Sequence, residues 1–163
     1  ASPTTTAESP TTTQLVTTTA ERSTTSTTTE EKRLAEVEQI LTDLWFGWFD
    51  AIYRKEADAL WDVVATTSKF EAGLQAMDTL AFTEPPSRAG IHVEIDELLL
   101  DRADCLVPYG TTSSEFLSGK PSVTGLEVLW PDPRRDWRMA TSWVFPQDLW
   151  LADCDEVTRE ETP

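Results

Sequence analysis

His92 is the only histidine in the chain, and histidine is the side chain best suited to gain and lose a proton at neutral pH. Glu94 follows on the same face of a predicted strand, so the two could act as a catalytic histidine and its carboxylate partner. The alternative is a polar pair that faces solvent, because catalysis also needs a nucleophile or a positioned substrate. The sequence has no GxSxG, HExxH or phosphate-binding loop. We therefore assign no catalytic residue from sequence.

Cys105 and Cys154 are the only cysteines. In an exported protein, two cysteines more often form a disulfide than remain as two thiols. A bond between them would close a loop of about 50 residues and contribute about 4 kcal/mol in the chain-entropy model. The alternative is a cytosolic protein with one buried and one exposed thiol. With one histidine and two distant cysteines, we expect no metal site and no cofactor.

A long helix is predicted from Glu30 to Tyr53, after threonines that can cap it. Its apolar residues recur at steps of three and four, which places them on one face: Leu34, Val37, Leu41, Leu44, Trp45, Trp48 and Ile52. The aromatic residues of this helix need a surface to pack on. Two further helical segments are predicted over residues 57–65 and 68–82, before Pro85 and Pro86.

The second half of the chain predicts four antiparallel strands. Residues 91–95 alternate between apolar and polar, and the parity slips at Glu97, which predicts a bulge or a strongly bent strand. Residues 105–109, 123–130 and 137–145 continue the pattern, and 149–151 could add an edge strand. Helices followed by strands predict an α+β fold, with N-terminal helices packed on one face of a curved antiparallel sheet of about four strands.

Composition divides the chain of 163 residues into three parts. Residues 1–29 are rich in Thr, Ser and Pro and predict a disordered tether, either an O-glycosylated stalk or a plain flexible linker. Residues 30–151 form the predicted α+β domain, and 152–163 an acidic tail. The chain begins without a methionine, so we expect a processed or trimmed form, with a lipid anchor upstream of residue 1 as one arrangement.

The net charge of −16 argues against nucleic acid and anionic membranes as partners, because both require a basic patch. No apolar run approaches 18 residues, so no membrane insertion is expected. Together with the tether, these features predict an extracytoplasmic protein, secreted or anchored to the cell envelope.

The order of elements resembles the NTF2-like superfamily, the cystatin-like cone fold of nuclear transport factor 2, ketosteroid isomerase and SnoaL-like polyketide cyclases. The resemblance lies in the long helix that breaks into a short one (FDAIYRKEADALWDVVA) and in a late hairpin (LEVLWPDPRRDWRMATSWVF). It covers residues 31–151 and is closest to small secreted or lipid-anchored actinobacterial proteins, most of them without an assigned activity. Trp48 stands where ketosteroid isomerase-like members carry a tyrosine, so we do not expect that chemistry.

The resemblance implies a deep pocket between the long helix and the concave face of the sheet. Its expected lining residues come from the helix and the later strands: Trp45, Trp48, Ile52, Tyr109, Trp143 and Phe145. The alternative is that these side chains simply fill the core. The parity of the strands favours a pocket without ionisable groups.

Two functions remain open at this point. The first is a non-enzymatic domain that binds a small apolar ligand or a protein partner, or that forms a homodimer through its sheet. The second is a SnoaL-like enzyme, of isomerase, cyclase or hydrolase type, that acts on a hydrophobic carbonyl compound. Its polar group would be Tyr53, His92 or Glu94.

Overall fold

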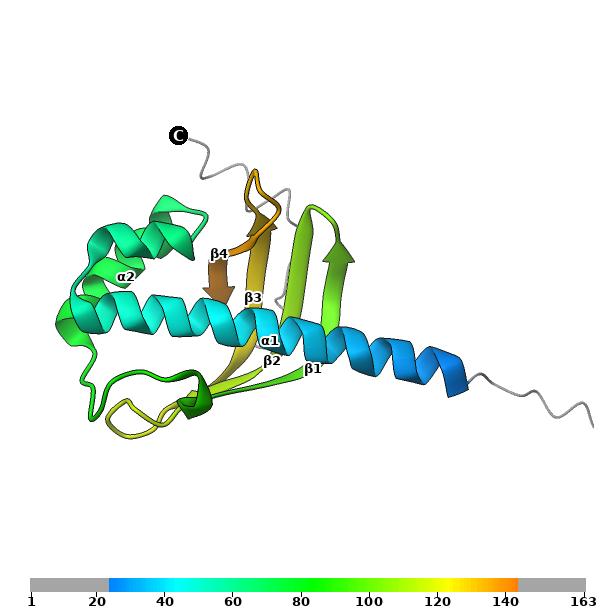
Figure 1. Cartoon of the computed structure of the whole chain (residues 1–163), viewed down its shortest axis with the longest axis horizontal. Helices are drawn as coiled ribbons and strands as arrows, with labels where there is room; N and C mark the ends of the chain where they lie inside the picture. Colours follow the sequence, from blue (N-terminus) through cyan, green and yellow to red (C-terminus); the bar gives the residue numbers. More distant parts are fainter. Residues whose placement is uncertain (1–23, 144–163) are drawn as a thin grey trace, which may run out of the picture.

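The computed structural model describes residues 24–143, and the side chains of residues 29–141. Helices come first and a four-stranded antiparallel sheet follows, which confirms the predicted α+β class (Figure 1). In chain order the elements are α1 (Thr24–Arg54), the 3-10 helix η1 (Ala57–Asp62), α2 (Thr67–Thr79), the 3-10 turn η2 (Arg88–Gly90), β1 (Ile91–Arg102), β2 (Cys105–Ser114), β3 (Ser122–Pro131) and β4 (Trp137–Trp143).

Helix α1 begins at Thr24 rather than at Glu30, so the predicted tether was too long at its C-terminal end. The predicted apolar face is confirmed, because Val37, Leu41 and Ile52 are buried within the core. The helix ends with Lys55 in the left-handed conformation. The Glu56 amide donates to the carbonyl of Ala51, and the Lys55 amide donates to that of Ile52, which together form a Schellman motif.

The second predicted helix, residues 57–65, is wrong in its last third. Only Ala57–Asp62 is helical, as η1, and the next residues run extended beside β4. The Ala65 amide donates to the Met139 carbonyl, and the Met139 amide donates to the carbonyl of Val63, both at 2.8 Å. This short parallel pairing covers the outer edge of β4, which would otherwise expose unpaired backbone groups.

Helix α2 begins at a threonine that also fixes the helix to the sheet. Thr66 is 2% exposed, and its hydroxyl accepts a hydrogen bond from the Lys69 amide at 3.2 Å. The same hydroxyl donates to the Ala140 carbonyl of β4 at 2.6 Å. One side chain therefore caps α2 and positions it against the last strand.

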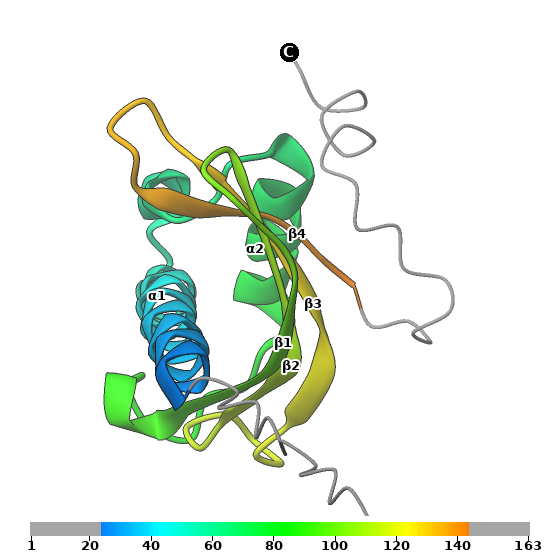
Figure 2. The ribbon, with the colours of Figure 1, turned by 90° about the vertical axis from the view of Figure 1, so that its right-hand side faces the viewer.

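The sheet has the order β1-β2-β3-β4, with every pair antiparallel. The register of β1 against β2 shifts between Ile95 and Glu97, which confirms the predicted bulge, and again between Leu98 and Leu100. Viewed along α1, the sheet is curved and the long helix lies on its concave side (Figure 2). Strand β2 continues to Ser114, beyond its predicted end at Tyr109.

The two faces of the sheet carry two separate apolar clusters. The larger includes Leu106, Leu129 and Met139 and joins the strands to the helices. The smaller occupies the opposite face, because its members alternate with those of the first along each strand: Cys105, Val107, Leu126, Val128 and Ala140. We call these the inner and the outer face.

None of the helices within residues 24–143 is long and apolar enough to cross a membrane. The predicted tether up to residue 23, the edge strand at 149–151 and the acidic tail at 152–163 lie outside the described residues.

Candidate functional site

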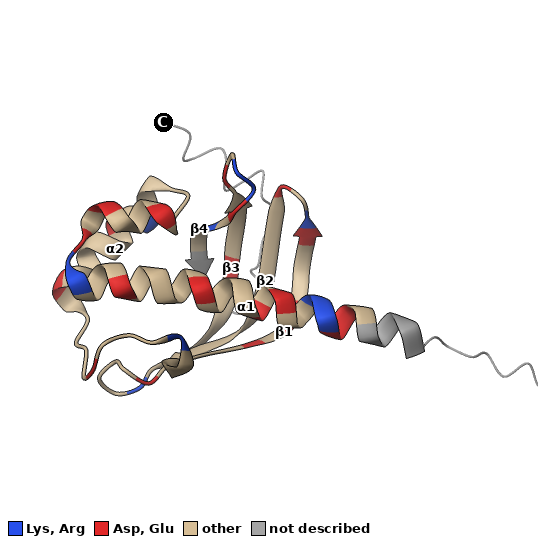
Figure 3. Ribbon diagram, in the orientation of Figure 1, with Lys and Arg blue, Asp and Glu red and all other residues tan. Residues whose placement is uncertain are grey.

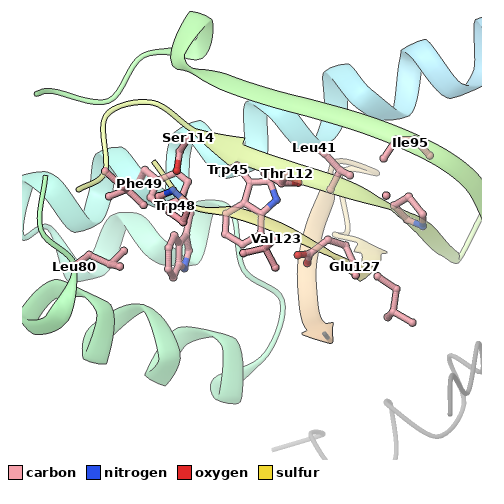
Figure 4. Close-up of a pocket in the computed structure, with 16 residues that line it drawn as sticks. Leu41, Trp45, Trp48, Phe49, Leu80, Ile95, Thr112, Ser114, Val123 and Glu127 are labelled. Atoms are coloured by element: carbon pink, nitrogen blue, oxygen red, sulfur yellow. The ribbon is translucent and has the colours of Figure 1, made fainter. Parts of the chain in front are cut away.

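A cavity of about 330 Å³ lies between α1 and the inner face of the sheet (Figure 4). This volume is at the lower end of the range of small-molecule sites, roughly 300–1,000 Å³. Residues from α1, from the three neighbouring strands and from two connections line it: Leu41, Trp45, Trp48, Phe49, Leu80, Ile95, Pro108, Gly110, Thr112, Ser114, Leu117, Pro121, Val123, Gly125, Leu126 and Glu127.

The cavity exists because large side chains on the helix face small ones on the strands. Gly110, Thr112 and Ser114 are successive inner-face positions of β2, and Gly125 pairs with Gly110 from β3. Two paired glycines leave no side-chain volume at the centre of the sheet. The helix cannot sink into that space, because the indole of Trp45 and its aromatic neighbours stand between the two layers.

The aromatic side chains of α1 hold one another in fixed orientations. Trp45 and Trp48 meet edge to face, with 5.4 Å between ring centroids, and Trp45 stacks on Phe49 at 5.6 Å. Phe49 in turn meets Phe116 edge to face at 5.1 Å. Such contacts are worth about 0.5–1.5 kcal/mol each beyond the area that they bury. The helix side of the cavity is therefore a preformed wall.

Among the described residues, one ionisable side chain lines the cavity, which contradicts the predicted lining without ionisable groups. It is Glu127 of β3, whose carboxylate lies 3.9 Å from the ammonium of Lys69. Both side chains are largely buried, at 13% and 9% exposure. The Lys69 ammonium also lies over the ring of Trp45, 4.8 Å from its centroid. The positive and negative charges at this end of the cavity therefore balance.

The indole nitrogens of Trp45 and Trp48 are buried and have no hydrogen-bond partner within the described part of the chain. A buried donor without a partner costs about 1–3 kcal/mol. A β-carbon at Gly73 of α2 would lie 3.2 Å from the Trp48 nitrogen, so glycine at that position leaves room for the indole. The aromatic wall is thus maintained at an energetic cost in unsatisfied donors.

The structure brings only part of the predicted pocket set together. Trp45 and Trp48 line the cavity. Ile52 lies farther along α1, buried in the main core, and is not among the lining residues. Tyr109 lies on the outer face of β2, between Pro108 and Gly110, and is not among the residues that line the cavity. The Trp143 side chain and Phe145 lie outside the described side chains.

The polar candidates lie away from the cavity. Tyr53 is 43% exposed, near the end of α1, with its ring 5.3 Å from that of Phe82. His92 is exposed at the start of β1, and its partner is Glu115 rather than Glu94, at 2.8 Å from Nε2 to Oε1. That hydrogen bond lowers the pKa of the Glu115 carboxyl. None of the predicted polar residues is therefore placed to act on a molecule in the cavity.

Apart from Lys69 and Glu127, the charged residues within 29–141 are spread over the surface. In the part of the chain that Figure 3 colours, acidic residues recur along α1 and α2, and basic residues are dispersed among them. Within the described range, no three His, Cys, Asp or Glu side chains are grouped so that they could hold a metal ion.

No family model, curated protein or solved structure matches the chain.

Sequence reasoning missed the strand side of the cavity. Thr112 and Ser114 stand in a Ser/Thr-rich stretch that was not assigned to a strand, and Glu127 lies between two outer-face apolar residues, Leu126 and Val128. A signal was present in Gly110 and Gly125, because glycine inside a strand often marks a close approach or a space that a ligand occupies.

Proposed function

We propose that the domain binds a small apolar molecule in the cavity between α1 and the sheet. The observation that carries the proposal is a cavity of about 330 Å³ that large aromatic side chains and paired glycines hold open. Its lining is mainly apolar, with few polar groups, which is the usual form of a small-molecule site. The ligand is neutral in this proposal, because Lys69 already balances the one carboxylate that lines the cavity.

The proposal extends to the family and the location of the protein. A long helix on the concave face of a curved antiparallel sheet supports the NTF2-like cone as the fold. The Thr-rich N-terminal sequence supports a position outside the cytoplasm, secreted or held at the cell envelope. A protein partner or a second copy bound at the sheet is the other binding mode within the same proposal.

A disulfide between Cys105 and Cys154 belongs to the same proposal. Cys105 is fully buried, and the described part of the chain contains no free cysteine. Cys154 is the only other cysteine of the sequence, and it lies outside the described residues. Denatured, unreduced protein should therefore expose no thiol to an alkylating reagent. Two alkylated cysteines would refute the bond.

An enzyme that acts on a hydrophobic carbonyl compound is the second candidate, and one observation favours it. Glu127 is an ionisable side chain that lines an otherwise apolar cavity, where a carboxylate could move a proton of a bound molecule. The variant Glu127→Gln tests this role. If Glu127 is the base, wild type and variant will contain different bound molecules after incubation with the same compound. The unreacted substrate will accumulate in the variant. Identical species in both would refute catalysis by Glu127.

The binding proposal is tested by native mass spectrometry of the full chain, expressed through an oxidising export route. The expected result is an adduct that disappears on denaturation. Thr112→Leu adds side-chain volume inside the cavity and should abolish the adduct. Thr111→Leu is the matched control, because Thr111 is the adjacent residue on the outer face of the same strand.

The result that contradicts the proposal is equally specific. An adduct that survives Thr112→Leu unchanged would place the ligand elsewhere. Wild-type protein without an adduct would be incubated with neutral aromatic alcohols, which match the neutral ligand of the proposal. If Thr112→Leu does not selectively reduce the binding of any of these probes, the cavity is not a binding site.

A further inference from the structure

The outer face of the sheet divides into a polar half and an apolar half. In the polar half, the hydroxyls of Thr111 and Thr124 bond to one another at 2.7 Å in exposed positions. In the apolar half, five residues are 0–2% exposed: Cys105, Val107, Leu126, Val128 and Ala140. An antiparallel sheet whose outer face meets water carries polar residues there, as the first half does.

The helices do not account for this burial. α1 and α2 pack on the inner face, with the larger apolar cluster. The side chains that pack against the outer cluster within the described range are Ala65, Leu99, Leu100 and Trp130, and all four are only partly buried themselves. A further segment is needed to exclude water from the apolar half of the outer face.

The end of the described chain stands next to this surface. β4 is the last strand of the described chain and lies at the end of the order β1-β2-β3-β4, and its final residue, Trp143, pairs with Leu126 of the outer cluster. Twenty residues follow, 144–163. The sequence FPQDLWLADC at the start of that segment contains four large apolar residues before Cys154.

The segment is long enough to reach Cys105. Cys105 lies two strands away from β4 and four residues along β2 from Tyr109, the partner of Leu126. Strand spacing and rise place it about 16 Å from the end of β4. The residues from Trp143 to Cys154 can span about 36 Å when extended. The path to Cys105 crosses the apolar half of the outer face.

We propose that residues 145–151 lie across the apolar half of the outer face and that the Cys105–Cys154 disulfide fixes them there. The segment is then an integral layer of the fold and closes the apolar half of the outer face, which leaves only the polar half open to the partner or second copy considered above. The inference goes beyond ligand binding, which concerns the inner face. It predicts that a partner or a second copy cannot use the apolar half of the sheet in the oxidised protein.

The test removes three of the four large apolar side chains of the segment from the full chain. The variant carries Leu149→Ser, Trp150→Ser and Leu151→Ser, and its urea midpoint should fall by about 1 M or more. Leu74→Ser is the control, because Leu74 is an exposed leucine of α2 and its loss should shift the midpoint little. Ligand binding in the inner cavity, measured by native mass spectrometry, is scored separately for both proteins.

Two results support the inference and three overturn it. A lowered midpoint for the triple variant, together with a monomer that contains an intramolecular Cys105–Cys154 peptide cross-link, supports it. A triple variant as stable as wild type overturns it. So does an intermolecular cross-link or a dimer that persists in the triple variant, because a second copy would then cover the face. If wild type shows no ligand adduct, that result contradicts only the proposal that the inner cavity binds a ligand.

Discussion

Gly110 is the position at which one added carbon atom should disturb the fold most. It lies in β2 opposite Ile95, where the register of β1 shifts. A β-carbon built on Gly110 would be 2.0 Å from the Glu94 carbonyl oxygen and 2.9 Å from the α-carbon of Ile95. Both are backbone atoms of the neighbouring strand, so no side-chain rotation can relieve the contact. We therefore expect Gly110→Ala to force the two strands apart.

The magnitude follows from two opposing effects. Overpacking typically costs about 1–3 kcal/mol, and a clash with a backbone ladder belongs at the upper end of that range. Replacing glycine with alanine also restricts the unfolded chain, which offsets about 0.4–1 kcal/mol. The free energy of unfolding should therefore fall by about 2–2.6 kcal/mol. With a urea dependence of about 2 kcal/mol per molar, the midpoint should fall by about 1–1.3 M.

Urea unfolding followed by tryptophan fluorescence measures this change. Gly119→Ala is the control, because Gly119 has a φ of +79° and no atom within 4 Å of an added β-carbon. It isolates the strain of the left-handed conformation, about 1–2 kcal/mol. If Gly110→Ala is no less stable than Gly119→Ala, the steric argument fails, and the close approach of β1 and β2 does not depend on glycine.

Two further predictions concern single side chains that hold elements together. Thr66→Val should lower the free energy of unfolding by about 2 kcal/mol, because α2 loses its cap and the Ala140 carbonyl loses a buried hydrogen-bond donor. Thr66→Ser keeps the hydroxyl and should retain most of the stability in the same urea titration. The Asp132 carboxylate accepts hydrogen bonds from the amides of Asp136 and Arg134, which lower its pKa, with Arg138 contributing less. Because the folded-state pKa is lowered, the carboxylate contributes its full stabilisation of the fold above about pH 4 and loses it as the pH falls through the folded-state pKa. Asp132→Asn should therefore be less stable than wild type at pH 7, and the difference in stability should shrink below about pH 4. A difference that does not change with pH would contradict this.

The sequence was sufficient for elements with one clear period. The spacing of Val37, Leu41 and Ile52 predicted the buried face of α1, and the slip at Glu97 predicted the bulge in β1. It failed at β2, because Cys105–Pro108 are all buried and alternation then does not distinguish the two faces. Tyr109 was expected in the pocket because of the resemblance to the NTF2-like cone, and it is not among the residues that line the cavity. The lining of the cavity depends on which strand positions are small, a property that hydrophobic periodicity does not report.

The position of α1 is fixed by contacts that do not depend on what the cavity contains. Near its N-terminal end, Arg33 binds Asp101 of β1 through two hydrogen bonds, at 2.7 and 2.9 Å. Five residues later, the Glu38 carboxylate accepts a hydrogen bond from the Ile95 amide at the bulge, at 3.1 Å. Beyond its C-terminal end, Ala65 is bonded to β4. A helix held at three separate points cannot collapse onto Gly110 and Gly125. The space between them therefore persists in the empty protein, and a ligand that enters it would need little rearrangement of the backbone.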